Sequence, residues 1–309
     1  MNALAKPVSK LPDVGTTIFT VMSALASEQG ALNLSQGFPD FDGPEPLLQA
    51  VNEHMRSGQN QYPPMAGVEA LREAIAEKVL DLYGLACDAD TEITVTAGAT
   101  EALFCAIAAV VHAGDEVIVL DPAYDSYDPV IRLQGAVPVH VSLMAPAYRI
   151  DWDRIEAAIT ANTRLLILNS PHNPTGMVMD ESDIAALSAL CAKYDIYLIG
   201  DEVYEHMVFD QAKHLSLCGY AELYARSFVI SSFGKTYHVT GWKVGYCVAP
   251  PALTKELRRL HQYVTFTVNT PVQLGIADFL QQHPEHHQQL PAFYQAKRDL
   301  FCELLQGSR

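Results

Sequence analysis

The sequence lacks any apolar run long enough to cross a membrane. Its longest apolar stretch is about Leu103–Val111, whereas a transmembrane helix needs about 18 or more such residues. The N-terminus, Met1–Pro7, contains no apolar segment of the kind that a secretory signal carries. With 49% apolar residues overall, the chain can still bury a substantial core. We therefore expect a cytoplasmic protein with no membrane partner.

Basic residues are also scarce. The sequence has 20 Lys and Arg against 36 Asp and Glu, which gives a formal net charge of −16, and no basic cluster stands out. A nucleic-acid backbone would be repelled by a field of this sign. The composition therefore argues against a nucleic-acid partner.

Metal-ligand patterns are missing too. The six cysteines are scattered without a C-x-x-C pair, which is typical of reduced thiols and not of a zinc site or a disulfide framework. One segment, His283-Pro284-Glu285-His286-His287, superficially resembles a ligand cluster. Its proline and the neighbouring glutamines favour a solvated loop, so we predict no metal site.

From about residue 92 the sequence alternates short β-branched runs with helical patterns. This alternation predicts an α/β fold with a seven-stranded, mostly parallel sheet and helices on both faces. The expected strands are Glu92–Thr96, Glu116–Leu120, Val137–Leu143, Leu165–Asn169, Ile196–Gly200, Ser227–Ser231 and Lys243–Val248. The expected helices are Val68–Tyr83, Glu101–His112, Asp153–Ala161 and Glu181–Tyr194.

The chain length suggests more than one domain. A chain of 309 residues exceeds what one compact core usually holds. Residues 1–45 are rich in Gly and Pro near their end and are expected to form an arm or loop that belongs to a small domain. Residues 46–270 would form the large domain. Residues 271–309 would add a connecting helix, with breaks near Pro284 and Pro291, and the start of an incomplete small domain.

Polar residues just after the strands are candidates for a site, because open α/β sheets bind ligands beyond the carboxyl ends of their strands. After the first strand, Ala97-Gly98-Ala99-Thr100 opens a helix whose free N–H groups and dipole favour a phosphate. Such turns also occur simply to pack a helix on a strand. After the fourth strand, the rigid turn Ser170–Gly176 presents Asn173, which a plain turn also explains.

Lys235 follows the sixth strand, in Ser231–Thr236. A primary amine at the rim of a buried strand, where burial can depress its pKa, is what a Schiff-base enzyme requires. Asp201 and Tyr204 follow the fifth strand, and a structural ion pair between Asp201 and Lys235 would explain these positions as well. A P-loop ending at Lys235 would need glycine where Val229 stands, which argues against nucleotide hydrolysis.

Taken in chain order, these residues resemble the fold-type-I pyridoxal-phosphate aminotransferases of class I/II. The resemblance runs from about Asn33 to the end of the chain. It rests on the Gly-Ala-Thr turn, the aromatic Tyr124, Asn-Pro-Thr-Gly, Asp-x-x-Tyr, and Ser-x-x-Lys with a basic residue eight positions on. The segments Asn33–Phe41, Asn60–Tyr62 and Thr240–Gly245 are most similar to the branch of kynurenine, glutamine and methionine aminotransferases.

The resemblance implies pyridoxal 5′-phosphate as the cofactor and catalytic roles for Lys235, Asp201 and Tyr204. Lys235 would hold the cofactor as a Schiff base and carry the transferred proton; lowering its pKa by about three units takes roughly 4 kcal/mol. Asp201 would pair with the pyridinium nitrogen. Tyr204 and Asn173 would hydrogen-bond the ring's 3-oxygen, and Tyr124 would stack on the ring.

The resemblance also implies a phosphate cradle and a homodimer. The cradle would consist of Gly98, Ala99, Thr100, Ser232 and Lys243. Many relatives carry Arg in place of Lys243, so the chain replaces a bidentate fork with a point charge. Tyr62 would reach the phosphate of the partner subunit, or else would simply cover its own surface. Gly37 and Asn173 are expected to contact the substrate.

The implied function is transfer of an amino group from an L-amino acid, with methionine or aromatic donors as the first to try, to a 2-oxo acid by a ping-pong cycle. Two alternatives stay open. One is a β-lyase acting on cysteine conjugates with the same cofactor. The other is a truncated cofactor-binding form with little activity, because family members continue past Arg309 into a segment holding the arginine that binds the substrate carboxylate.

Overall fold

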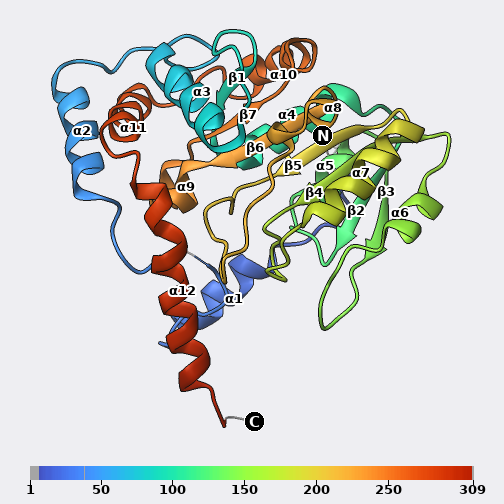
Figure 1. Ribbon diagram of the computed structural model, residues 1–309. Helices are drawn as coiled ribbons and strands as arrows, with labels where there is room; N and C mark the ends of the chain where they lie inside the picture. Colours follow the sequence, from blue (N-terminus) through green and yellow to red (C-terminus); the bar gives the residue numbers. More distant parts are fainter. Residues whose placement is uncertain (1–6, 38, 308–309) are drawn as a thin grey trace, which may run out of the picture.

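A single sheet of seven strands forms the centre of the molecule in the computed structural model, which describes residues 7–37 and 39–307 (Figure 1). The strands are β1 (Ile93–Thr96), β2 (Glu116–Asp121), β3 (Val137–Ser142), β4 (Thr163–Asn169), β5 (Tyr197–Asp201), β6 (Ser227–Ser232) and β7 (Gly245–Val248). Each lies within two residues of a strand expected from the sequence.

The sheet has the order β1-β7-β6-β5-β4-β2-β3. Strands β3, β2, β4, β5 and β6 run parallel to one another, whereas β7 runs antiparallel to both β6 and β1. The predicted seven-stranded, mostly parallel sheet is therefore confirmed. Because all strands except β7 point the same way, their carboxyl ends lie along one edge of the sheet.

Helices cover both faces of the sheet, as Figure 1 shows. They are α1 (Ile18–Glu28), α2 (Glu45–Arg56), α3 (Glu69–Tyr83), α4 (Gly98–Val110), α5 (Tyr127–Leu133), α6 (Trp152–Ala158), α7 (Glu181–Lys193), α8 (Ala221–Tyr224), α9 (Phe233–Thr236), α10 (Pro251–Val264), α11 (Thr270–Gln282) and α12 (His286–Leu304), with short 3-10 turns η1 (Leu217–Gly219) and η2 (Thr240–Trp242).

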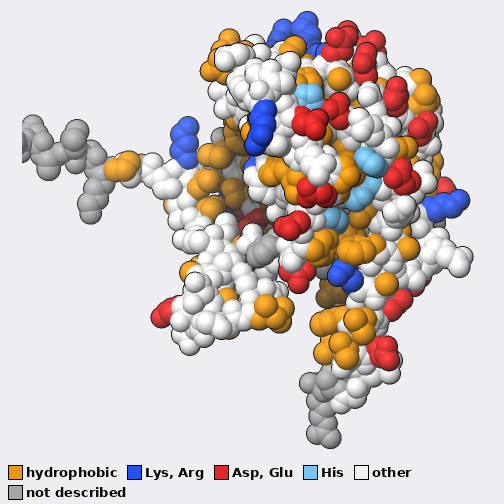
Figure 2. Space-filling model, turned by 90° about the vertical axis from the view of Figure 1, so that its left-hand side faces the viewer, with side chains coloured by type: hydrophobic (Ala, Val, Ile, Leu, Met, Phe, Trp, Pro, Cys, Tyr) orange, Lys and Arg blue, Asp and Glu red, His pale blue; other side chains and the backbone are white. Residues whose placement is uncertain are grey.

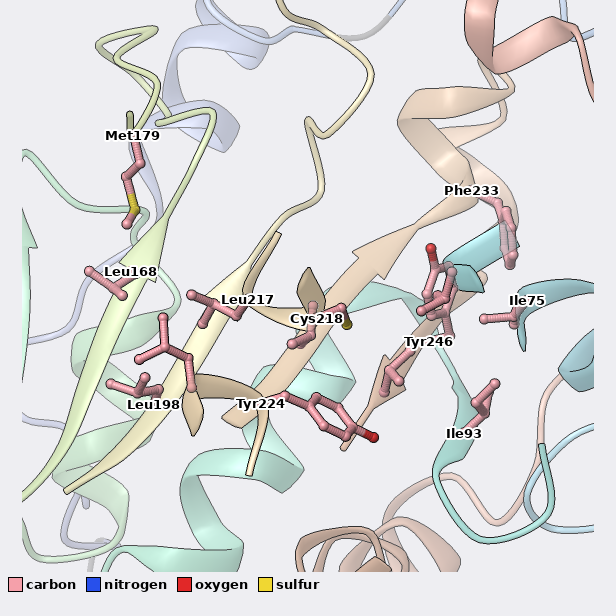
Figure 3. Close-up of a cluster of buried hydrophobic side chains, with 14 of the residues drawn as sticks. Ile75, Ile93, Leu168, Met179, Leu198, Leu217, Cys218, Tyr224, Phe233 and Tyr246 are labelled. Atoms are coloured by element: carbon pink, nitrogen blue, oxygen red, sulfur yellow. The ribbon is translucent and has the colours of Figure 1, made fainter. Parts of the chain in front are cut away.

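Two apolar clusters pack on the two faces of the sheet, because successive side chains of a strand point to opposite sides. In β4, Leu165 and Ile167 pack with residues of α4, α5 and α10. Leu166 and Leu168 pack on the other face with residues of α2, α3, α7 and α11. Figure 3 shows part of this second cluster, where Leu168, Leu198 and Tyr246 project from β4, β5 and β7.

Local sequence signals explain where several predicted helices begin and end. Asp180 caps α7, accepting hydrogen bonds from the backbone of Ser182 and Asp183, while the Asp183 carboxylate returns to the Asp180 N–H. This reciprocal arrangement satisfies N–H groups that the first turn leaves free. At the other end of α3, Gly84 adopts a φ of 75°, a conformation that favours glycine after a helix.

The two ends of the chain differ from expectation. The expected N-terminal loop contains α1, whose side chains are not buried and whose apolar residues Ile18, Val21 and Leu25 stay exposed. The expected break near Pro291 is also wrong, because α12 continues through this residue. Helix α12 starts with buried His287 and Leu290, and its last turns expose apolar side chains next to the grey C-terminal residues in Figure 2.

Within residues 7–37 and 39–307, no helix is both long and apolar enough to span a bilayer.

Candidate active site

The register of the strands brings the predicted site residues to the carboxyl edge of the sheet. Asn169 at the end of β4 lies beside Asp201 at the end of β5, and Asp201 lies beside Ile230 of β6. Ser232, two residues further along β6, lies beside Gly245 of β7. The sheet therefore gathers residues that are far apart in the sequence.

Lys235 lies on the short helix α9, directly after β6. Its Nζ donates a hydrogen bond to the Gly37 carbonyl oxygen at 2.5 Å and lies 5.7 Å from the centre of the Tyr204 ring. Partial burial lowers the pKa of the Lys235 amine, and the nearby Lys243 ammonium lowers it further. Both effects favour the neutral amine, which is the nucleophilic form.

Asp201 is a buried carboxylate at the floor of the site. Its Oδ2 accepts a hydrogen bond from the Tyr127 hydroxyl at 2.5 Å, and its Oδ1 accepts a longer one from the Val203 N–H at 3.4 Å. Burial raises the pKa of Asp201 to about 6, against the lowering effect of the Tyr127 hydroxyl. An ion pair between Asp201 and Lys235 does not occur among the ion pairs of the described residues.

Tyr127 was missed by the sequence reasoning. It starts α5, three residues after the predicted Tyr124, and its ring stands edge-on to the Tyr124 ring with 5.7 Å between centres. The rule that located the other residues, a polar side chain shortly after a strand end, applies to it as well. Tyr127 is fully enclosed, and burial raises the pKa of its hydroxyl far above the usual range.

Tyr204 and Tyr124 lie close enough to Asp201 for its charge to affect both. Burial first, and then the charge of Asp201, raises the pKa of Tyr204 to about 12. The pKa of Tyr124 is also raised by burial, while a hydrogen bond with the Thr100 side chain acts in the opposite direction. Both phenols therefore stay protonated near neutral pH and can donate hydrogen bonds.

The turn before α4 has the close packing that the sequence suggested. Gly98 has a φ of 74°, and a methyl group at this position would meet the Lys243 Nζ at 3.2 Å. A methyl group on Gly245 would meet the backbone nitrogen of Ala99 at 2.7 Å. The turn and Lys243 therefore lie side by side, with Lys243 exposed at the surface of the site.

Ser232 and Asn173 hold the neighbouring backbone. The Ser232 hydroxyl caps α9 by accepting the Gly234 N–H at 3.2 Å. The N–H of Asn173 donates to the Asn169 side chain at 2.7 Å, and the Asn169 amide donates to the Asp201 carbonyl oxygen at 2.8 Å. Asn173 itself is only partly buried, so its side chain is accessible.

Tyr62 lies apart from the carboxyl edge of the sheet, on the loop between α2 and α3. Its side chain is 84% exposed, and its ring packs edge-on against Phe266 at 5.6 Å between centres. Within this single chain Tyr62 therefore projects outward from a surface loop.

A buried ionic cluster lies beneath the site and was not anticipated. The Lys78 Nζ contacts Glu205 Oε1 at 2.6 Å, and the Ser231 hydroxyl donates to the same oxygen at 2.5 Å. Burial by itself would raise the pKa of Glu205, but the Lys78 ammonium holds it well below its usual range. Glu205 follows Tyr204 and Ser231 precedes Ser232, so this cluster joins two segments that carry site residues. Lys78 occupies the apolar stripe of α3, a position that could have signalled its burial.

The segment His283–His287 is not a simple solvated loop. His286 hydrogen-bonds the Thr236 carbonyl oxygen at 3.1 Å, and the His287 ring lies 5.1 Å from that of buried His206. Figure 2 shows several histidine side chains, in pale blue, on the face turned to the viewer. In the part of the chain that the structure describes, no three His, Cys, Asp or Glu side chains are grouped as metal ligands.

The site suits a planar, phosphorylated cofactor with a cationic ring nitrogen. A buried carboxylate whose pKa is raised would be stabilised by a nearby cation. The glycine turn at a helix start and the amine of Lys243 offer donors for a dianion. Lys235 provides a nucleophile on the same side of the sheet. These donors match pyridoxal phosphate in charge and in chemistry.

Comparisons with known proteins agree with this geometry. The family described as aminotransferase class I and II matches residues 29–308. Methionine aminotransferase of Escherichia coli K12 is 55% identical over 303 residues, which cover 98% of this chain and 78% of that protein. Kynurenine–oxoglutarate transaminase of Dictyostelium discoideum is 35% identical over 325 aligned positions, which cover 99% of this chain and 75% of that protein.

Solved structures give the same result. An Escherichia coli structure described with a methionine aminotransferase function superimposes with a TM-score of 0.96 at 55% identity, covering 99% of this chain and 80% of that one. N-succinyldiaminopimelate aminotransferase of Mycobacterium tuberculosis superimposes with a TM-score of 0.94 at 41% identity, and the match covers 97% of this chain and 79% of that one.

Proposed function

Because the chain belongs to the class I and II aminotransferases, we propose that it uses pyridoxal phosphate to move an amino group from an L-amino acid, methionine first, to a 2-oxo acid. The observation that carries the cofactor assignment is the combination of a half-buried Lys235 and a fully buried Asp201 on the same edge of the sheet. The identity of 55% with a methionine aminotransferase supports methionine as the first donor to test.

Lys235 is proposed as the residue that binds the cofactor and moves the proton. Its lowered pKa increases the fraction of neutral amine, which can attack a carbonyl carbon. When bound, pyridoxal phosphate supplies that carbonyl and a ring that withdraws electrons from the reacting carbon. When not bonded to the cofactor, the Lys235 amine would be able to take the substrate's α-proton and to return a proton on the other side of the transferred nitrogen.

Asp201 is proposed to keep the ring nitrogen protonated. A cation next to it would favour the ionised carboxylate and offset the burial that raises its pKa in the isolated chain. Tyr127 holds the carboxylate in place through its short hydrogen bond. Tyr204 and Asn173 are proposed to donate to the ring's 3-oxygen, and Tyr124 to stack on the ring.

The phosphate is proposed to bind at the turn of Gly98, Ala99 and Thr100, with Ser232 and Lys243 opposite. The contact between Gly98 and the Lys243 side chain supports this arrangement. Tyr62 is proposed to act in a homodimer by reaching the phosphate site of the partner. Its exposure on a projecting loop supports that role.

Gly37 and Asn173 are proposed to line the substrate position. The Gly37 carbonyl contacts the Lys235 amine, so Gly37 lies next to the reacting group. We retain residues 46–270 as the proposed large domain, with 1–45 and 271–309 assigned to the small domain. Arg309 lies outside the described residues.

The test is spectroscopic. Purified protein mixed with pyridoxal phosphate should show the visible absorbance of a Lys-bound cofactor, and Lys235→Ala should abolish it. Lys193→Ala, at an exposed lysine, is the matched control and should leave the absorbance unchanged. Methionine with a 2-oxo acid should then give the corresponding amino acid. A wild-type protein that takes up no cofactor would refute the proposal, and pyruvate released from a cysteine conjugate without any 2-oxo acid would indicate β-elimination instead.

A further inference from the structure

Behind the proposed phosphate turn, a buried glutamate and a buried histidine lie in direct contact. Glu101, in the first turn of α4, places Oε1 2.6 Å from Nδ1 of His261 on α10. The His261 side chain is fully buried, and that of Glu101 is 6% exposed. The other carboxylate oxygen, Oε2, accepts the Ala97 N–H at 2.6 Å, so Glu101 holds the residue that precedes the turn.

The same histidine also holds the loop that carries Tyr62. His261 Nε2 lies 2.9 Å from the Met65 carbonyl oxygen. Two other carbonyl oxygens of this loop also accept hydrogen bonds. Thr270, the first residue of α11, donates to Gln61 at 2.6 Å, and Thr267, which lies between α10 and α11, donates to Pro64 at 3.2 Å. The loop is therefore fixed to the protein at its base while Tyr62 projects from it.

These contacts determine where the protons of the pair lie. A carbonyl oxygen can only accept, so Nε2 of His261 must carry a hydrogen and donate to Met65. A neutral imidazole with hydrogen on Nε2 has only a lone pair at Nδ1. An ionised Glu101 facing that lone pair would place two acceptors 2.6 Å apart with no hydrogen between them. One further proton must therefore lie between Glu101 Oε1 and His261 Nδ1.

With that proton, the pair carries no net charge. Either His261 is a cation beside an ionised Glu101, or His261 is neutral beside a protonated Glu101, and both sums are zero. The Cys105 thiol, 3.6 Å from Oε1, adds a weak donor and no charge that would alter this sum. A net negative charge at this position would oppose an anion bound at the neighbouring Gly98–Thr100 turn.

We propose that Glu101 and His261 are positioning residues that share a proton, so that Glu101 can fix the phosphate turn through Ala97 without repelling the phosphate. Through Met65 the same pair fixes the loop that carries Tyr62. This inference rests on the proposed function, since the anion concerned is the phosphate of the cofactor. It predicts that His261→Gln lowers the affinity for pyridoxal phosphate much more than Glu101→Gln does.

The test compares Glu101→Gln, His261→Gln and the double variant, by titrating each apoprotein with pyridoxal phosphate and with pyridoxal, which lacks the phosphate. His261→Gln keeps an amide group that can donate a hydrogen bond but cannot supply the extra proton, so Glu101 becomes a net negative charge. We expect its affinity for pyridoxal phosphate to fall about tenfold, with affinity for pyridoxal changed less than about twofold.

Glu101→Gln should behave differently, because its amide can donate to His261 Nδ1 and its oxygen can still accept the Ala97 N–H. We expect affinity within about twofold of wild type, and we expect the double variant to recover most of the affinity that His261→Gln loses. Thr254→Val, a buried change on the same helix that removes a hydrogen bond to Ala249, is the matched control and should alter neither affinity.

Equal losses in the two single variants, a double variant weaker than His261→Gln, or equal losses for pyridoxal and pyridoxal phosphate would overturn the proposal. The nitrogen-15 resonances of the His261 ring in the apoprotein give a second measurement that needs neither cofactor nor substitution. Hydrogen on Nε2, with or without hydrogen on Nδ1, supports the proposal, and a neutral ring with hydrogen on Nδ1 alone overturns it. If wild-type protein bound neither pyridoxal compound, the proposed function would fail while these resonances still decided the state of the pair.

Discussion

As the pH rises, the Asp201→Asn apoprotein should become more stable relative to the wild-type apoprotein. The same substitution should weaken cofactor binding. Asp201 is buried without a cation in the described structure, and its only donors are the Tyr127 hydroxyl and the Val203 N–H. Burying a carboxylate in this way favours its protonated form in the folded state. Asparagine cannot ionise, so the substitution removes this pH-dependent cost and also removes the partner for the cofactor's ring nitrogen.

The magnitude follows from the pKa of Asp201, which burial raises to about 6, compared with about 3.9 for an unfolded aspartate. A raised folded pKa means that the folded state holds the proton more tightly. The resulting stabilisation is complete below the unfolded pKa and is lost as the pH rises through the folded pKa. The total stabilisation of the folded state is about 3 kcal/mol, and about 1.4 kcal/mol of it is lost between about pH 5 and pH 8.

The assay is denaturant unfolding of wild-type and Asp201→Asn apoprotein across this pH range, with Asp153→Asn, at an exposed position, as the control. The free energy of unfolding of Asp201→Asn relative to wild type should rise by about 1.4 kcal/mol from about pH 5 to pH 8. The control difference should stay flat. A flat difference for Asp201→Asn as well, or one that falls with pH, would refute the assignment of a costly buried carboxylate.

Three further substitutions test other parts of the structure. Lys78→Met leaves the buried Glu205 carboxylate without its cation and should lower the free energy of unfolding by about 3–5 kcal/mol. Adding Glu205→Gln should restore part of this stability. A loss below about 1 kcal/mol would contradict the ion pair. Gly245→Ala places a methyl group 2.7 Å from the Ala99 nitrogen, so the free energy of unfolding should drop by about 1–3 kcal/mol. The affinity for pyridoxal phosphate, measured by titration, should also fall. An unchanged affinity would argue against the phosphate turn. Tyr62→Phe should alter the free energy of unfolding by less than about 0.5 kcal/mol because the side chain is exposed. It should weaken cofactor binding only at protein concentrations where a dimer forms. A loss of affinity of the same size in the monomer would exclude action across a subunit interface.

Much of this site could be predicted because its residues lie next to strand ends that the sequence marks clearly. The β-branched runs locate β4, β5 and β6, and the polar residues that follow them include Asn173, Asp201 and Lys235. The glycine turn before α4 is also marked locally, since its small residues immediately follow β1. Hydrophobic period and turn chemistry are properties of a few consecutive residues, so they can be read without knowing the fold.

Other features needed the tertiary structure, because they depend on which segments the sheet order brings together. Tyr127 meets Asp201 across 74 positions of sequence, Lys78 meets Glu205 across 127, and Glu101 meets His261 across 160. The partners in each pair lie so far apart in the sequence that no local pattern connects them. The sequence by itself determined the αβ alternation and the chemistry at the strand ends. Only the packing of α3, α4 and α10 on the sheet decided which buried charges are compensated, since compensation depends on distances between segments and not on their order along the chain.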